Sequence, residues 1–528
     1  MKKNKSRLFL SALVAALLVL QSCMDLTEKP QTFLAPEFYF TTVAQCESAI
    51  VGALNCIQPF RDGEYFSGPP TFADGIRSRA RLNYINTSYN GWWNTHYLAI
   101  TNLNYVIKAC TDGRMDETRA DVKDVLGQAY FWRAFNYFSL VQFYGKVLWK
   151  DENTDFTINK PTPESRMEVE FLYDKIEQDF TKAFELMFDF NSARKARPCK
   201  WSAKAMLAKF YLTRATAPLK QTSNYAKAAA AAEEVIRCGH YNLLPFDQIF
   251  LSSNPDNAEY IIAFHYNDLF IGNPGTNFYL PGWPTTQPTQ IGNPTVGAPY
   301  NLANYQFILD YPDQPRKHIY FGINWPMYID HPEENWVWRY WDEPRPADGE
   351  DPRPGFYGRR NPQCLKYTWP NITIKQLMTI YGNYGGQLNP FLRITEMYLC
   401  YAEAANMDPN GNRQKAVDYL NLIIDRANKP FKSIFPLTNV EGKQERASLS
   451  WSKEYFNEKV WEERRWELCF EHTAYWDVLR FERLKQVNFL NKYPGYEDDK
   501  DDYFTPKDYL FPIPPRDAQT IGQNPGYP

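Results

Sequence analysis

The strongest constraint on the fold is a proline-rich segment in the middle of the chain. Residues 265–390 make up about a quarter of the 528 residues but hold 17 of the 38 prolines and six of the 15 tryptophans. Because proline interrupts helices and is excluded from central strands, this segment cannot form long helices or a central sheet. Its aromatic content argues against disorder. We therefore expect ordered loops and short edge strands here, and ordered loops of this length are usually functional.

The regions on either side carry apolar residues at helical spacing. Before the middle segment, we expect helices over 43–57, 92–109, 116–143, 165–187, 201–215 and 225–236, with Asp116 as the N-cap of the third. After it, we expect a helix from Leu392, a second around 417–424, a long third over 460–482 and an extended tail over 510–528. The chain is therefore expected to be mostly α.

One of these helices carries a pattern typical of tetratricopeptide repeats. Leu126-Gly127-x-x-Tyr130 is followed by Ala134-x-x-x-Phe138, although Lys123 stands where the repeat has tryptophan. The small residues let neighbouring helices approach closely while the aromatic rings fill the space beside them. Since the spacing between helix pairs is uneven, we interpret them as degenerate repeats that bury their apolar stripes against each other.

The N-terminus has the layout of a secretory signal. Four basic residues precede an apolar run over 8–20, and Leu20-Gln21-Ser22-Cys23 then resembles a bacterial lipobox. The run is shorter than the roughly 20 residues that span a bilayer, so a spanning helix is the weaker interpretation. We expect cleavage after residue 22 and lipidation of Cys23. The remaining chain has 54 basic and 61 acidic residues, a net charge of −7, which argues against a nucleic-acid partner.

Five motifs follow one another along the chain. They are Cys23-Met-Asp-Leu-Thr-Glu-Lys-Pro30, Gly127-Gln-Ala-Tyr-Phe-Trp-Arg133-Ala-Phe-Asn-Tyr-Phe138, Arg393-Ile-Thr-Glu396-Met-Tyr-Leu-Cys-Tyr-Ala-Glu403-Ala, Glu463-Arg464-Arg465-Trp-Glu467-Leu-Cys-Phe-Glu471 with Trp476-Asp477-Val-Leu-Arg480, and Phe511-Pro-Ile-Pro514 with Gln523-Asn-Pro-Gly-Tyr527. In this order they resemble the SusD/RagB family of outer-membrane lipoproteins, over all of the chain except its middle.

The resemblance implies a fold, a function and a partner. The fold would be a helical scaffold with four tetratricopeptide-like pairs and a loop-rich ligand-binding half. The protein would bind a nutrient at the cell surface and pass it to a SusC-like TonB-dependent barrel in the outer membrane, over which it sits as a lid. Most relatives are associated with glycans, and the RagB branch with peptides. We accordingly divide the chain into a signal peptide (1–22), an N-terminal helical region (23–264), a loop-rich ligand-binding insert (265–391) and a C-terminal helical region (392–528).

The charged residues of the C-terminal motifs resemble a catalytic array, because paired carboxylates can perform acid–base chemistry. The arginines among them favour interhelical ion pairs instead. The residues concerned are Arg393, Glu396, Glu403, Glu463, Arg464, Arg465, Glu467 and Glu471. We find no G-x-S-x-G, H-E-x-x-H, P-loop or G-x-G-x-x-G motif, and no metal-like spacing of cysteine and histidine. We expect no enzymatic activity, no cofactor and no metal.

A glycan site needs aromatic rings for the apolar faces of the sugars and polar groups for their hydroxyls. Two regions offer these residue types. In the first, over 72–93, the predicted contacts are Asp74, Arg81, Tyr84 and Trp92; the corresponding loop of glycan-binding relatives often supplies an Asp, an Arg and an aromatic residue. In the second, the middle segment, they are Trp283, Trp325, Trp336, Trp338 and Trp341. Strand alternation would put Trp336, Trp338 and Tyr340 on one face, and the alternative is that these rings fill a local core.

Several alternatives stay open at this stage. Peptide capture, as in the RagB branch, would use fewer aromatic rings, so the tryptophans favour a glycan. A surface glycoside hydrolase would use the acidic residues of 342–351, but the five prolines between Pro344 and Pro362 favour a surface loop. The acidic run over 497–502 lacks the spacing of a calcium loop. Cys46 and Cys56 could pair, whereas Cys400 and Cys469 are expected to be buried thiols.

Overall fold

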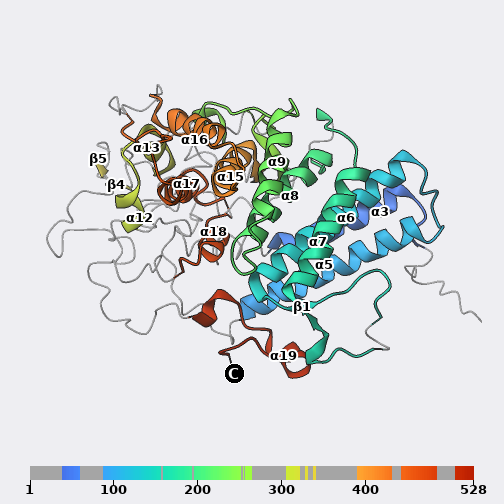
Figure 1. Ribbon diagram of the computed structural model, residues 1–528. Helices are drawn as coiled ribbons and strands as arrows, with labels where there is room; N and C mark the ends of the chain where they lie inside the picture. The colour runs from blue at the N-terminus through green and yellow to red at the C-terminus, as the bar shows by residue number, and fades with distance from the viewer. Residues whose placement is uncertain are drawn as a thin grey trace, which may run out of the picture.

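The computed structural model describes residues 39–59, 87–155, 159–192, 196–250, 254, 256–264, 305–321, 328–330, 337–339, 389–430, 442–471, 473–484 and 506–527. Helices dominate these residues, as Figure 1 shows, and the strands form only short two-stranded ribbons. Within these ranges, no helix combines the length and the apolar character that a membrane span requires.

Among the described residues of the N-terminal half, six α-helices follow one another, and each packs on the next along the chain. They are α3 (Val43–Pro59), α5 (Thr87–Thr111), α6 (Ala120–Tyr144), α7 (Val169–Leu186), α8 (Lys200–Ala215) and α9 (Asn224–Arg237). The six predicted helices are confirmed, with ends shifted by a few residues. Asp116 is not the N-cap of α6, which is Arg119. Its carboxylate instead accepts hydrogen bonds from the backbone and hydroxyl of Thr118, closing a turn before the helix.

Helix α6 lies at the centre of this half and is buried on nearly every face. Its aromatic rings meet those of its neighbours edge to face, as between Phe131 and Phe180 and between Phe138 and Phe210. A Cβ atom at Gly127 would lie 2.7 Å from Cγ and 3.0 Å from the backbone nitrogen of Met187, just beyond α7. The close helix approach predicted for this position is therefore confirmed.

The C-terminal half contains α15 (Ile394–Met407), α16 (Arg413–Asn428), α17 (Lys453–Glu467), α18 (Ala474–Arg480) and α19 (Pro515–Ile521). Helix α15 packs on α8, α9, α16 and α17 and so joins the two halves. The hydrophobic core is correspondingly continuous from α3 to α19.

In this half, the helices predicted from Leu392 and around 417–424 are confirmed as α15 and α16, whereas two other predicted elements are wrong. The helix expected from Leu392 begins at Ile394, because residues Asn389–Arg393 form strand β6, which pairs with β3 (Tyr260–Phe264). The long helix over 460–482 is split into α17 and α18, and Phe470 between them has a φ of 58°. The tail is not extended throughout: α19 begins at Pro515, a position where proline fits a helix because its missing N–H has no helical partner.

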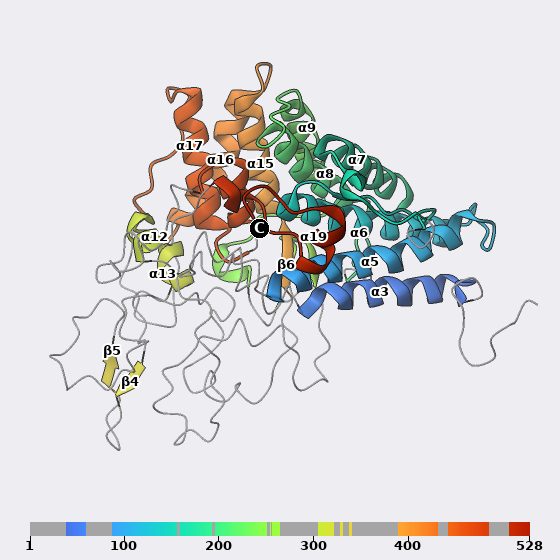
Figure 2. The ribbon, with the colours of Figure 1, turned by 90° about the horizontal axis from the view of Figure 1, so that it is seen from below.

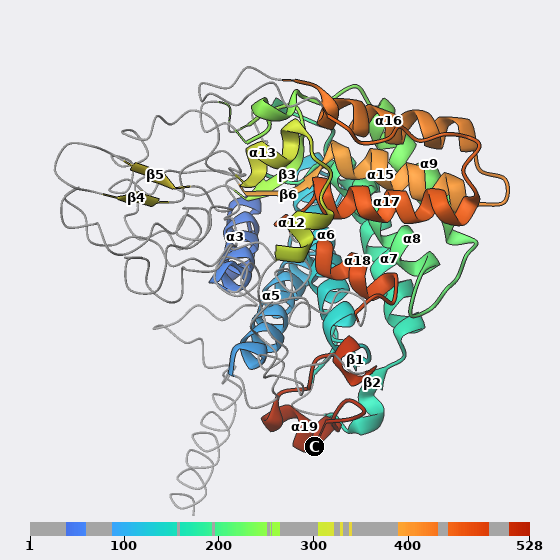
Figure 3. The ribbon, with the colours of Figure 1, turned by 90° about the vertical axis from the view of Figure 1, so that its left-hand side faces the viewer.

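The described part of the middle segment contains only short elements, as expected. These are α12 (Tyr305–Asp310), α13 (Pro315–Phe321) and the antiparallel ribbon of β4 (Tyr328–Asp330) and β5 (Val337–Arg339). A further ribbon, β1 (Val147–Leu148) with β2 (Arg166–Met167), lies between α6 and α7. Figures 2 and 3 both show β6 between α13 and the α3–α5 pair, with β4 and β5 away from the helices.

Candidate functional site

Most of the predicted ligand contacts lie outside the described residues. These are Asp74, Arg81, Tyr84, Trp283, Trp325, Trp336 and Trp341, and the same holds for Cys23, Tyr340 and the acidic residues of 342–351 and 497–502. For Trp338 the structure describes the backbone, which lies in β5 opposite Ile329 of β4. These residues therefore remain predictions, and so does the aromatic face along β5.

Trp92 is the exception, and its prediction as a glycan contact is wrong. Its side chain is 1% exposed. The indole packs on the rings of Phe143 and Phe511, with centroid distances of 4.8 and 5.5 Å. Trp93 is buried as well, edge to face with Tyr144. Both rings hold the start of α5 against the end of α6, since an apolar side chain at this junction gains more from packing than from solvent exposure.

The arginine of the α6 motif joins several elements of the N-terminal half. Arg133 is buried and donates through Nε to Asp179 of α7 at 2.7 Å. Its Nη1 donates to Glu152 at 2.6 Å and to Asn104 of α5 at 3.0 Å. One guanidinium thereby fixes α5, α6, α7 and the segment after β1. Its role in this fold is structural, because every direction of its planar fork ends on a protein acceptor.

The charged residues of the C-terminal half form two buried ion-pair networks. In the first, Glu467 lies at the centre of three arginines: Arg316 at 2.6 Å, Arg393 at 3.1 Å and Arg426 at 2.7 Å. Glu259, Glu463 and Glu471 complete this network through the same arginines. Arg393 also reaches the backbone carbonyl of Glu467, the last residue of α17. This contact satisfies the carbonyl at the end of α17, and the same guanidinium binds the carboxylates of Glu467 and Glu471.

The second network lies between α15, α17 and α18. Asp477 accepts from Arg464 at 2.8 Å and from Arg480 at 2.6 Å. Glu396 binds Arg464, and Glu403 binds Arg480. Lys209 also pairs with Glu396 at 3.1 Å. Burial opposes the ionised form of Asp477, yet the two arginines hold the pKa of its carboxyl below the usual range.

The two networks confirm the scaffold interpretation of the motif carboxylates. Glu396, Glu403, Glu463, Glu467 and Glu471 are all buried and each binds at least one arginine. Arg465 instead lies over the rings of Phe307 and Trp461. A general acid or base must reach a substrate, and these carboxylates are held inside the protein by cations.

An open groove lies on the side of the molecule where the C-terminal tail crosses the β1–β2 ribbon. Its volume is about 1350 Å³, more than the roughly 300–1,000 Å³ of typical small-molecule pockets. Its lining includes Lys146, Arg166, Lys220, Trp476, Tyr509 and Leu510. At its edges Lys146 pairs with Glu168 at 2.5 Å and Lys220 with Glu482 at 2.6 Å. Sequence reasoning missed this groove because its walls come from segments more than 250 residues apart.

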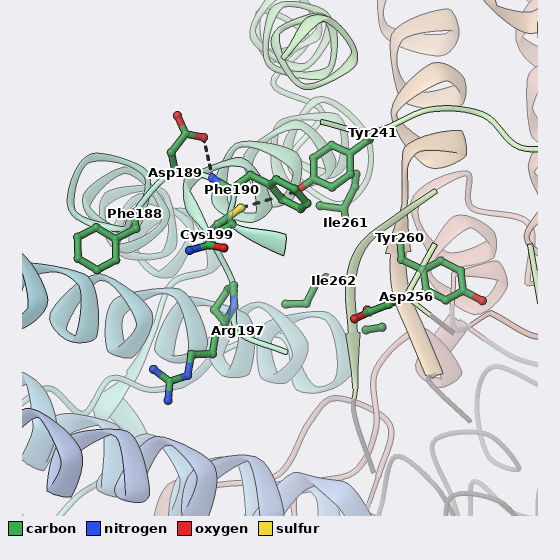
Figure 4. Close-up of a pocket in the computed structure, with 13 residues that line it drawn as sticks. Phe188, Asp189, Phe190, Arg197, Cys199, Tyr241, Asp256, Tyr260, Ile261 and Ile262 are labelled. Atoms are coloured by element: carbon green, nitrogen blue, oxygen red, sulfur yellow. Dashed lines mark hydrogen bonds between the residues drawn. The ribbon is translucent and has the colours of Figure 1, made fainter. Parts of the chain in front are cut away.

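A smaller pocket lies beside strand β3, between the ends of α7 and α8 (Figure 4). Cys199 Sγ lies 3.6 Å from the hydroxyl of Tyr241, and Ile261 and Ile262 of β3 form the opposite wall. The free volume is about 20 Å³, which holds about one water molecule. This pocket is therefore too small for a sugar ring.

Two family descriptions match separate parts of the sequence. The family described as "Starch-binding associating with outer membrane" matches residues 72–212, and the "SusD family" matches residues 349–527. Among curated proteins, the chain is similar to SusD-like protein P2 of Formosa agariphila, with 26% identity over 97% of this chain and 98% of that protein.

The fold is also shared with solved structures. A SusD homologue from Bacteroides thetaiotaomicron superposes with a TM-score of 0.71 at 19% identity, covering 93% of this chain and 98% of that one. Surface glycan-binding protein A from the same organism, in complex with laminarihexaose, superposes with a TM-score of 0.65 at 18% identity, covering 91% and 99%. These likenesses show that the chain shares the fold of those proteins.

Proposed function

Since the chain belongs to the SusD/RagB family, we propose that it is a lipid-anchored cell-surface protein that binds a nutrient glycan and delivers it to a SusC-like TonB-dependent transporter in the outer membrane. The observation that carries this proposal is the family fold combined with a tryptophan-rich segment between β3 and β6. A relative of the same fold was solved with a bound laminarihexaose, which supports a glycan as the ligand class.

The proposed capture needs geometry and no covalent chemistry. Aromatic rings cover the C–H faces of sugars, and we take as the scale of each contact the gain of an aromatic pair, about 0.5–1.5 kcal/mol beyond its buried area. Such rings bind best when a rigid frame holds them in position before the ligand arrives. The buried ion-pair networks and the junction at Arg133 supply that rigidity, because opening them would leave uncompensated charges inside the protein.

The site is tested by calorimetric titration with panels of oligosaccharides and peptides. We expect binding to an oligosaccharide and none to peptides of similar length. Replacing Trp283, Trp325, Trp336, Trp338 or Trp341 by alanine should lower the affinity for the oligosaccharide by about 2–10-fold for each ring that contacts it. The combined replacement should abolish binding and leave the Tm unchanged. Trp451→Ala serves as the control, because this half-buried indole packs on Tyr455 and lies outside the middle segment of the sequence.

Full affinity in the combined variant would overturn this site assignment. In that case the groove beside the C-terminal tail is the next site to test, and Tyr509→Ala probes it because this half-buried ring lines the groove. Binding of peptides but not of glycans would contradict the ligand class and favour the RagB-like alternative. Cleavage of the bound glycan, abolished by one Asp or Glu replacement within 342–351, would favour a hydrolase.

A further inference from the structure

Arg166 of β2 is a half-buried cation that lines the groove beside the C-terminal tail. Its Nε donates to the carbonyl of Lys146 at 2.9 Å, its Nη1 to the carbonyl of Gly522 at 3.3 Å, and its Nη2 to the side-chain oxygen of Asn524. All three acceptors are uncharged, and within the described part of the chain no carboxylate pairs with this guanidinium, whereas the buried Arg133 binds two. Burial accordingly lowers the pKa of Arg166 below its ordinary value. The groove wall thus carries a positive charge that no described carboxylate balances.

The hydrogen bonds of Arg166 leave donors for a ligand. A guanidinium has five N–H groups, two of them on each terminal nitrogen. Each terminal nitrogen of Arg166 makes one of the bonds above, so each keeps a second N–H group. A planar carboxylate accepts from two such groups at once, which is the arrangement in which arginine binds it most strongly. The bonds to the tail also hold the guanidinium in place before a ligand arrives, so less ordering is needed on binding.

Lys507 supplies a second cation in the lining of the same groove. Its Nζ lies 5.0 Å from the centroid of the Tyr527 ring, and among the residues that the structure describes it has no carboxylate partner. Lys146, Lys220 and Arg480 also line the groove, but each is already paired with a carboxylate. Arg166 and Lys507 are therefore the two lining cations with capacity for an anionic ligand.

The rest of the lining fits a sugar better than a simple anion. Glu164, two residues before Arg166, lines the groove, and its carboxylate accepts from the hydroxyl of Thr162 at 2.7 Å. A carboxylate has further lone pairs, which accept from the hydroxyl groups of a sugar but repel a phosphate or an acidic peptide. Tyr509 adds a half-buried ring that offers a flat apolar face. The groove thus combines donors for a carboxylate, an acceptor for hydroxyls and a ring for C–H groups.

We propose that this groove binds an acidic oligosaccharide, with the carboxylate of a uronic acid unit on Arg166 and Lys507 and a sugar hydroxyl on Glu164. The site is distinct from the predicted contacts of the middle segment, which contributes no residue to the lining. Its volume of about 1350 Å³ exceeds that of pockets for drug-sized ligands, so it has room for several sugar units. The inference rests on the proposed function, because it takes glycans to be the molecules that the protein meets.

The test is a calorimetric titration of the mature protein with tetragalacturonate and with its carboxyl-reduced form, in which each carboxylate is a primary alcohol. We expect Arg166→Gln to weaken binding of tetragalacturonate by about 10–100-fold, the scale of a charge-assisted hydrogen bond. Lys507→Gln should weaken it by about 2–10-fold, because this lysine acts as a single point charge. Neither change should alter binding of the reduced form. Lys108→Gln is the matched control, since this exposed lysine of α5 lies outside the groove.

Lys507→Gln decides the matter if Arg166→Gln fails to fold, because the lysine Nζ packs only on a ring. Equal affinity of this variant and the wild type for tetragalacturonate would overturn the proposal, as would the absence of binding by the wild type. A tetraglutamate peptide carries the same side-chain charge without hydroxyl groups, so equally tight binding of this peptide would overturn a sugar as the ligand.

A neutral oligosaccharide that binds to the middle segment keeps the two proposals separate. The combined tryptophan variant should lose this neutral ligand and retain tetragalacturonate. Neutral binding without any effect of Lys507→Gln on tetragalacturonate would overturn the groove alone. Binding of tetragalacturonate that depends on Lys507, with no neutral ligand bound, would support the groove and contradict the middle-segment site alone.

Discussion

Burial determines how much a charged residue of this chain contributes to stability. Glu467 contacts three arginines and is fully buried, so its carboxylate compensates cations that have no access to water. Exposed pairs such as Lys146 with Glu168 have side chains that are 50% and 71% exposed. A buried ion pair is therefore important for stability, whereas an exposed one contributes little, because burial lowers the local dielectric constant.

Glu467→Gln keeps the size of the side chain but removes its charge. We expect this variant to lose about 3–5 kcal/mol of unfolding free energy, since three arginines would face an uncharged amide. Lys146→Gln, the matched exposed change, should cost less than about 1 kcal/mol. Urea unfolding followed by circular dichroism measures both values. Similar losses in the two variants would contradict the central role of Glu467.

His96 gives the chain a defined dependence of stability on pH. The imidazole is 4% exposed, and its Nδ1 lies 2.7 Å from Oδ1 of Asn136. The amide nitrogen of Asn136 donates to the carbonyl of Trp132, so its oxygen faces His96 and Nδ1 is the protonated nitrogen. Burial is the main cause that lowers the pKa of His96 to about 4, and the bond to Asn136 opposes it.

The direction of this pH dependence follows from the pH at which the folded and the unfolded states bind the proton. The unfolded chain protonates this histidine below its ordinary pKa of about 6.5, whereas the folded protein does so only near pH 4. The folded state should therefore lose up to about 3 kcal/mol as the pH falls from 6.5 to 4. His96→Gln lacks this term, so the stability difference between wild type and variant should shrink over that range. A difference that stays constant from pH 7 to 4 would refute the buried neutral imidazole.

At the scale of elements, close helix packing depends on particular small residues. We expect Gly127→Ala to destabilise the protein by about 1–3 kcal/mol, because the new Cβ would meet the backbone and side chain of Met187. Gly52→Ala in α3 has no atom within 4 Å of the new Cβ and should stabilise the helix by roughly 0.5–1 kcal/mol. Thermal unfolding of both variants gives the comparison, and a fall in Tm for both would show that helix propensity alone does not account for Gly52.

The sequence predicted α3, α5, α6, α7, α8 and α9 because apolar residues recur in each at helical spacing, and in α6 they cover nearly every face. The errors lie where distant contacts override the local pattern. The break after α17 puts Phe470 at a positive φ, which the pattern over 460–482 does not reveal, and the apolar residues of β6 resemble the start of α15. The sequence puts Trp92 among the predicted ligand contacts, because it does not show that the distant Phe511 packs on this ring. The groove likewise depends on how distant segments meet, which no single stretch of sequence contains.

At the scale of the whole molecule, the proposed function requires attachment to a membrane through the N-terminus. We expect Cys23→Ala to abolish labelling by a radioactive fatty acid and to move the protein from the membrane fraction to the soluble fraction, with an unchanged Tm. Ser22→Ala provides the control, since it keeps the cysteine and a small residue before it. Continued lipid labelling of the Cys23→Ala variant would refute the anchor.

The central claim is that the protein binds a glycan and leaves its covalent bonds intact. It is tested most directly by titrating the purified mature protein with a panel of oligosaccharides in a calorimeter and then analysing the recovered ligand by mass spectrometry. We predict saturable binding of at least one oligosaccharide that is recovered at its original length. Recovery of shortened products, or saturable binding of peptides with no response to any glycan, would contradict the account.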